Sequence, residues 1–206
     1  MNVLDKVVLL GTGLIAIYVI WRLYRDLRSG LRAGRAPVYY LASFAVLLAA
    51  GLLLIGLGYG VLGNPLVVVV ASLIPATLSL GLVTEFFPRY EKPYAAFAIV
   101  GLLGIALTRV SGPSGLATLV LAVVHAVAGL LIVALPVLAG LTGRAPRGFL
   151  WVGLGGVLIG IGGIALAFLK AGLPILPASF IFSILAPLLL FMTACFAQGF
   201  LSTPRR

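Results

Sequence analysis

The chain alternates between long apolar runs and short polar gaps. Each run holds about 20 mostly apolar residues, the length that an α-helix needs to cross about 30 Å of hydrocarbon. Seven such runs each predict one membrane-spanning helix: 4–21, 38–60, 65–87, 94–110, 115–141, 149–169 and 175–201. Because the gaps are short, we expect consecutive helices to run antiparallel as neighbours.

Composition supports an all-α integral membrane protein. Hydrophobic residues make up 63% of the 206 residues and charged residues only 9%, with a mean hydropathy of +1.27. Soluble domains carry about 25% charged and about 45–50% apolar residues, so a soluble protein of this composition would have too little polar surface. No segment remains for a second domain, and we expect residues 1–206 to form a single polytopic membrane domain.

The basic residues between the runs predict the orientation, because cytoplasmic loops carry an excess of Lys and Arg. With the N-terminus outside, the segments 22–37, 88–93, 142–148 and the tail from Ser202 lie inside and hold eleven basic residues. The outer side then holds three: Lys6, Arg109 and Lys170. This split predicts an external N-terminus, a cytoplasmic C-terminus and a multi-pass protein of the cell membrane.

The most basic gap, 22–37, has the pattern of an interfacial amphipathic helix. Its arginines recur at steps of three or four residues, so a helix would gather them on one side: Arg22, Arg25, Arg28, Arg32 and Arg35. We expect contacts with anionic lipid headgroups; a plain topology anchor and a docking site for a cytoplasmic partner are the alternatives. Since the net charge of +10 comes mostly from such gaps, we do not expect nucleic acid as a partner.

A weak internal repeat follows the first helix. An aromatic residue opens each helical hairpin, about 52 residues apart: Phe44, Phe97 and Phe149. The second helix of each hairpin contains a proline, which kinks a helix by removing a backbone hydrogen bond. These prolines are Pro75, Pro136 and Pro187. One helix followed by three similar hairpins is an architecture that fits this pattern.

The stretch 153–165, GLGGVLIGIGGIA, contains the G-x-G-x-x-A pattern of a dinucleotide-binding loop. That loop must stand between a strand and a helix, whereas this one lies within an apolar run, so we reject a cofactor site. Small residues at steps of three and four line one helix face: Gly153, Gly156, Gly160, Gly163 and Ala167. Small residues let membrane helices approach closely. We therefore expect this face to pack against a helix of this chain or of a second copy.

Three ionisable residues are candidates for function, because such groups at membrane depth often mark sites or pathways. His125 lies near mid-membrane, and its alternative role is structural, as a neutral ring bonded to a carbonyl or hydroxyl. Glu85 stands four residues before Arg89, in the favourable order for a helical ion pair; an ion-coupling role is the alternative. Arg109 is one of the three basic residues of the predicted outer side.

The sequence predicts no cofactor and no metal. A bis-histidine haem needs a second histidine, and His125 is the only one. A zinc site needs more ligands, and a retinal Schiff base of the kind found in microbial rhodopsins needs a lysine in the last span, which has none. We find no nucleophile–base pair or paired carboxylates at membrane depth, so we do not expect an enzyme.

Polar residues in the predicted helix centres are few, whereas a path for a hydrated solute needs many hydrogen-bonding groups. We therefore expect a non-catalytic membrane subunit or scaffold that packs through small-residue helix faces. Its partners would be other membrane subunits or further copies of the chain. Two alternatives stay open: a transporter or channel for a small or lipophilic solute, and a membrane sensor with a basic cytoplasmic face.

Overall fold

The computed structural model describes residues 1–170 and 175–202, apart from the side chains of Ala167 and Lys170. Over these residues the chain is all-helical, without a strand. The long helices are α1 (Val3–Arg28), α2 (Ala36–Leu57), α3 (Pro65–Phe86), α4 (Glu91–Ser111), α5 (Ser114–Leu141), α6 (Leu150–Lys170) and α7 (Ala178–Leu201). Short 3₁₀ helices lie in three connections: η1 (Tyr59–Gly63), η2 (Pro88–Tyr90) and η3 (Arg147–Phe149). In this part of the chain seven helices are long and apolar enough to cross a membrane, which confirms the predicted number.

Local chemistry sets the helix ends. At the start of α1, Asn2 and Asp5 form a reciprocal capping box: the Asp5 amide donates to Asn2 Oδ1 at 2.7 Å, and the Asn2 amide donates to Asp5 Oδ2 at 3.1 Å. Such caps satisfy the amides that a helix start leaves free. Asn64 caps α3 with a single hydrogen bond, in which its side chain accepts from the Leu66 amide at 2.9 Å.

The basic segment is not one helix through Arg35, so that expectation is wrong. α1 continues past the apolar run as far as Arg28, and the chain then turns back. Gly30 and Gly34 adopt φ angles of 72° and 93° in this turn, a region that glycine enters without a steric penalty. The five arginines therefore divide between the end of α1 and a turn that leads into α2.

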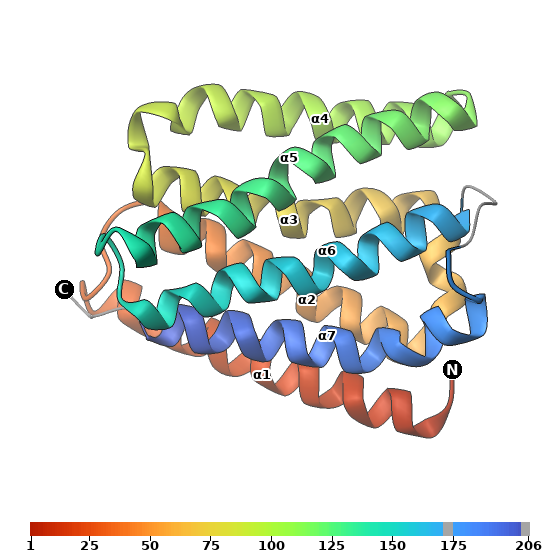
Figure 1. Ribbon diagram of the computed structural model, residues 1–206, viewed down its shortest axis with the longest axis horizontal. Helices are drawn as coiled ribbons and strands as arrows, with labels where there is room; N and C mark the ends of the chain where they lie inside the picture. The colour runs from red at the N-terminus through yellow and green to blue at the C-terminus, as the bar shows by residue number, and fades with distance from the viewer. Residues whose placement is uncertain (171–174, 203–206) are drawn as a thin grey trace.

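Six helices form a closed ring, and α4 lies outside it. Around the ring, α1 packs on α2, α2 on α3, α3 on α5, α5 on α6, α6 on α7, and α7 back on α1. The main packing partners of α4 are α3 and α5, and Figure 1 shows it at the edge of the bundle. The helices α3, α5 and α7 each contain their proline, as expected. The origin of the three helical hairpins by duplication of a single hairpin stays a prediction.

An aromatic cluster fills the core at the end of the bundle where the described chain ends. Phe200 of α7 is fully buried at its centre. The ring centroid of Phe200 lies 4.4 Å from that of Tyr40, 5.7 Å from that of Phe149 and 5.9 Å from that of Phe44. Aromatic pairs at such separations add stability beyond the area they bury. Helix α7 therefore packs against both α2 and η3 in this core.

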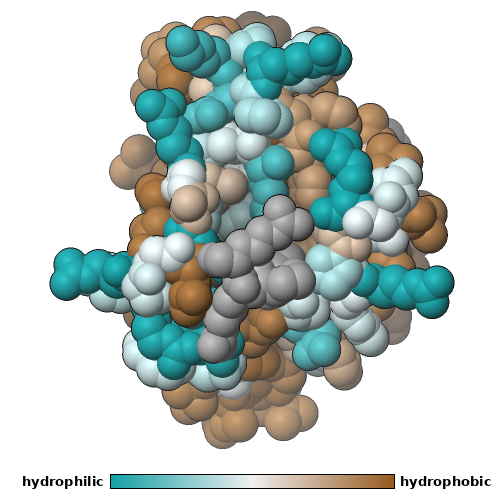
Figure 2. Space-filling model, turned by 90° about the vertical axis from the view of Figure 1, so that its left-hand side faces the viewer, coloured by the Kyte–Doolittle hydropathy of each residue, from teal (hydrophilic) through white to brown (hydrophobic). Residues whose placement is uncertain are grey.

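The outer surface of the bundle is apolar along its length and polar at its ends. On α4 the side chains of Leu103, Leu107 and Val110 are 58%, 67% and 72% exposed. Figure 2 looks onto the end where α1 finishes and shows hydrophilic side chains on that face, with hydrophobic flanks around it. This distribution suits a bilayer, in which hydrocarbon surrounds the middle and water meets the ends.

Candidate functional site

A buried tyrosine holds the carboxylate of Glu85 at the hydrophilic end. The hydroxyl of Tyr40, on α2, donates to Glu85 Oε2 at 2.6 Å. The Tyr40 side chain is 1% exposed, and its ring lies where a Cβ at Gly81 would be, so only glycine fits at that position of α3. Arg32 is close enough to Glu85 for the two charges to interact. Sequence reasoning missed Tyr40, because nothing in the chain links residue 40 to residue 85.

The predicted ion pair between Glu85 and Arg89 is wrong. α3 ends at Phe86, and Arg89 belongs to the separate turn η2. Phe87 precedes Pro88, and the residue before a proline is disfavoured in helical conformation. The four-residue spacing therefore loses its helical geometry, and the Arg89 guanidinium lies 4.6 Å from the ring centroid of Tyr90.

Two of the five predicted headgroup arginines fold back onto the protein. Arg32 Nη2 donates to the carbonyl of Phe200 at 2.6 Å, and its Nε lies 3.8 Å from Asp26 Oδ2. Arg35 forms an ion pair with Glu91 at 3.4 Å. These contacts join the turn after α1 to α7 and to the start of α4. They give Arg32 and Arg35 a structural role that spacing alone did not predict.

The other three arginines each lie over an aromatic ring four residues earlier on α1. The guanidinium carbon of Arg25 is 4.8 Å from the Trp21 ring centroid. Arg22 lies over Tyr18 at 5.9 Å, and Arg28 over Tyr24 at 5.8 Å. Tyr18, Trp21 and Tyr24 are each about half exposed. We call these six residues the arginine–aromatic ladder.

The predicted glycine face of α6 divides into a packed half and an open half. A Cβ at Gly153 or Gly156 would touch α5, at Val137, Val133 and Ile132, so these two glycines pack as expected. A Cβ at Gly160 or Gly163 would meet nothing within 4 Å in the part of the chain that the structure describes, so a continuous contact with the described helices is wrong. Ala167 lies outside the described side chains.

Two other glycines of α6, which the predicted face left out, make the contact with α7. A Cβ at Gly155 would lie 2.6 Å from two ring atoms of Phe196, and one at Gly162 would overlap the side chain of Leu188. α6 is therefore packed on two sides near its start, against α5 and α7. The stretch 153–165 was too rich in glycine for spacing alone to select the packed face.

His125 and Arg109 come near one another on α5 and α4. His125 Nδ1 lies 3.0 Å from the carbonyl of Leu121 on its own helix. The guanidinium of Arg109 is close enough to the imidazole for their charges to interact. Arg109 Nε is buried and has no hydrogen-bond partner among the described residues. Glu85 lies at the other end of the bundle, so the three candidate residues do not form one site.

A polar hollow of about 290 Å³ opens at the end where α1 begins. It is lined by Met1, Asn2, Asp5, Tyr59, Ser179, Phe182 and Ser183. The rings of Tyr59 and Phe182 stack, with centroids 5.5 Å apart. Burial, together with the negative charge of Asp5, raises the pKa of Tyr59 to about 12. The phenol therefore stays neutral at physiological pH.

Among the described residues, no group of three or more His, Cys, Asp and Glu side chains is placed to hold a metal ion.

Comparison of the chain with protein families, curated proteins and solved structures found no match. The class of protein therefore rests on the fold. Its seven long apolar helices, with apolar flanks and polar ends, are those of a multi-pass membrane protein.

Proposed function

We propose that the protein is a non-catalytic subunit of a larger membrane assembly. In this proposal a membrane-spanning helix of a partner subunit packs against the outer halves of α5 and α6. The observation that carries the proposal is the open space beside Gly160 and Gly163 of α6. Glycine in a helix interior costs about 1 kcal/mol relative to alanine, and in membranes its common use is close helix contact.

The register between α5 and α6 extends the open face to both helices. Gly156 lies against Ile132 and Val133, and the two helices are antiparallel, so Gly160 stands opposite Gly129. A Cβ at Gly129 also meets nothing within 4 Å. Figure 1 shows why: α5 runs from beside α6 at one end to beside α4 at the other. Glycines of both helices thus border the open face on which we place the partner helix.

Charge supports a partner with an acidic side chain. The four acidic residues of the chain are Asp5, Asp26, Glu85 and Glu91. Within the part of the chain that the structure describes, none of them forms an ion pair with Arg109. The buried Arg109 Nε also lacks a hydrogen-bond acceptor among the described residues, which is costly. A carboxylate on the partner helix, near His125 and Arg109, would remove this cost.

The polar side chains of the spans support a packing role over a solute path. Ser72, Thr77, Thr118 and Thr193 donate to carbonyls three or four residues earlier on their own helices, at 2.7 to 2.9 Å. Serine and threonine in helices commonly bond in this way, which leaves little hydrogen-bonding capacity for a passing solute. The proposal includes the orientation given by the basic residues, with the N-terminus outside a cell membrane.

The test combines photocrosslinking with a matched pair of substitutions. A photoreactive amino acid at Gly163 should give an adduct with a membrane-spanning chain in native membranes, and one at Gly56, on the open side of α2, should not. Gly160→Leu should release that chain during purification without lowering the melting temperature, whereas Gly56→Leu should retain it. An adduct between two copies of this chain, or with lipid alone, would overturn the proposal that the protein belongs to a larger assembly.

A further inference from the structure

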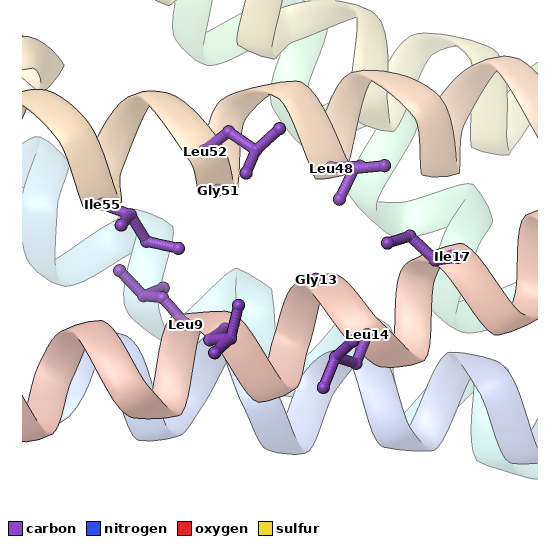
Figure 3. A pocket seen from close by; sticks show the side chains of 9 residues that line it. Leu9, Gly13, Leu14, Ile17, Leu48, Gly51, Leu52 and Ile55 are labelled. Atoms are coloured by element: carbon purple, nitrogen blue, oxygen red, sulfur yellow. The ribbon is translucent and has the colours of Figure 1, made fainter.

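An apolar groove runs between α1 and α2 on the outside of the ring. Its lining comes from both helices and is entirely apolar: Leu9, Leu10, Gly13, Leu14, Ile17, Leu48, Gly51, Leu52 and Ile55. Figure 3 shows Leu9 and Ile17 of α1 and Leu48 and Ile55 of α2 reaching into the space between the helices, with Gly13 and Gly51 on opposite sides. Its enclosed volume of about 50 Å³ is too small for a helix and holds only a short part of a hydrocarbon chain, so the rest of an acyl chain would lie along the open surface of the two helices.

The groove continues along α1 into the arginine–aromatic ladder. Residues at steps of three or four share one helix face, and such a series joins the two features: Leu10, Leu14, Ile17, Trp21, Tyr24 and Arg28. The face is therefore apolar in its first half, aromatic next and cationic at its end. This is the order of chemistry along a phospholipid, from the acyl chain through the interface to the headgroup.

Helix length places the ladder at the membrane surface. The 26 residues of α1 span about 39 Å at 1.5 Å per residue, whereas the hydrocarbon layer is about 30 Å thick. If the layer begins near Leu4, about 20 residues take it to Leu23, so Tyr24 to Arg28 lie among the headgroups. Trp21 and Arg22 then lie in the last turn within the layer, from which a long arginine side chain reaches the headgroups. The groove then lies wholly within the hydrocarbon.

The ladder has donors to offer an anion. The hydrogen bond from Arg22 Nη1 to Tyr18 Oη, at 3.1 Å, is exposed, so an anion can reach the end of this guanidinium group. No carboxylate pairs with Arg28 among the described residues, and Arg25 lies 3.6 Å from Asp26, whose other oxygen faces Arg32. The aromatic rings hold the guanidinium groups along the helix surface, which lowers the entropy lost when an anion binds.

We propose that α1 and α2 bind one anionic phospholipid, with an acyl chain in the groove and the phosphate among Arg22, Arg25 and Arg28. The site excludes Arg32 and Arg35, whose side chains contact the Phe200 carbonyl and Glu91. The structure thus selects three of the five arginines of the segment and adds an acyl-chain site that composition does not reveal. The proposal does not depend on which leaflet faces this end, or on the partner subunit proposed above.

Tryptophan fluorescence tests the headgroup site, because the chain has only Trp21 and Trp151. Trp151→Phe leaves Trp21 as the reporter in vesicles of brominated phosphatidylglycerol or brominated phosphatidylcholine. Quenching should show a preference for phosphatidylglycerol of about fivefold or more, the value of one arginine near an anionic surface. Trp21→Phe leaves Trp151, on α6, as the matched reporter, which should show a smaller preference.

Charge-matched variants decide whether the ladder causes this preference. Replacing Arg22, Arg25 and Arg28 by glutamine should bring the Trp21 ratio to about one. Replacing Arg89, Lys92 and Arg147 by glutamine removes the same charge from the same end and should leave the ratio unchanged. A Trp21 ratio near one in the parent protein, or a preference that survives loss of the three ladder arginines, would overturn the proposal.

The acyl-chain site has its own matched pair on α2. A Cβ at Gly51 or at Gly56 meets nothing within 4 Å, but only Gly51 lines the groove. Gly51→Leu should fill the groove and reduce the phosphatidylglycerol retained after detergent extraction, measured by native mass spectrometry. Gly56→Leu should retain as much as the parent protein. Equal retention by the two variants would show that no acyl chain lies in the groove.

Discussion

The phenol of Tyr40 donates to the carboxylate of Glu85 over 2.6 Å, and this bond joins the second turn of α2 to the last turn of α3. The tyrosine is buried in the aromatic core, while Glu85 is exposed at the end of the bundle. The pair therefore connects the core to the hydrophilic end face. Glu85, the acidic residue that the sequence singles out as a candidate for function, thus has a defined structural partner in Tyr40.

Loss of the Tyr40 hydroxyl should destabilise the protein more than loss of the hydroxyl of the neighbouring Tyr39. Tyr40→Phe removes the donor to Glu85 and leaves the rest of the buried ring in place, at a cost of about 1–2 kcal/mol. Tyr39→Phe is the control, because Tyr39 donates to Glu91 at 3.1 Å in a more open position, and it should cost less than about 0.5 kcal/mol. Thermal unfolding in detergent compares the two, and equal costs would remove the special role of the Tyr40–Glu85 bond.

The two glycine surfaces of α6 should respond differently to the same substitution. Gly155→Leu drives a side chain into Phe196 and should cost about 1–3 kcal/mol, the usual range for overpacking. Gly160→Leu extends into open space and should leave the purified protein as stable as before. This order is the reverse of the one that the spacing of Gly153, Gly156, Gly160 and Gly163 predicts. Melting temperatures of the two variants measured side by side decide between them.

Single cysteines should report the orientation of the bundle. Ser29 follows α1, and Ser114 begins α5 at the opposite end; both are exposed, while the native Cys195 is buried. Ser114→Cys should react with an impermeant maleimide on intact cells, and Ser29→Cys only after the membrane is opened. Labelling of both from one side would contradict the topology that the eleven basic residues predict.

The environment of His125 predicts a protein without haem absorbance. Its Nδ1 lies beside the Leu121 carbonyl, and the chain offers no second histidine as an axial ligand. The purified protein should therefore show no Soret band, and the absorbance spectrum of His125→Ala should match that of the parent. A Soret band that disappears with this substitution would show the opposite.

Ionisation of the Tyr59 phenol should make the protein less stable in strong alkali. Burial and the charge of Asp5 raise its pKa to about 12 from the usual 10, so the folded state favours the neutral phenol. This contribution is complete below pH 10 and is lost as the pH rises from 10 to 12. The tyrosinate absorbance that Tyr59→Phe removes should titrate near pH 12, and Asp5→Asn should lower this midpoint. An unchanged midpoint in Asp5→Asn would show that burial alone sets the pKa.

Run length and composition predict the seven helices, because the thickness of a bilayer fixes how many apolar residues a span needs. Contacts between spans follow different rules. Glu85 and Arg89 do not form the predicted helical ion pair, because α3 ends before Pro88. The glycine face of α6 is packed only in its first half, because α5 diverges from α6 beyond it. The contact of Arg32 with the Phe200 carbonyl joins residues 168 positions apart, a separation that no local pattern reveals.

Closure of the six-helix ring has a consequence for biosynthesis. α1 is synthesised before the other six described spans and packs on α7, which is synthesised after them, and Phe200 supplies the centre of the aromatic core. Until residue 200 is made, the inward face of α1 and the ring of Tyr40 lack their final neighbours. Premature termination before α7 therefore leaves an open arc of helices. In such an arc Tyr40 and Phe149 lack the ring contact that Phe200 provides.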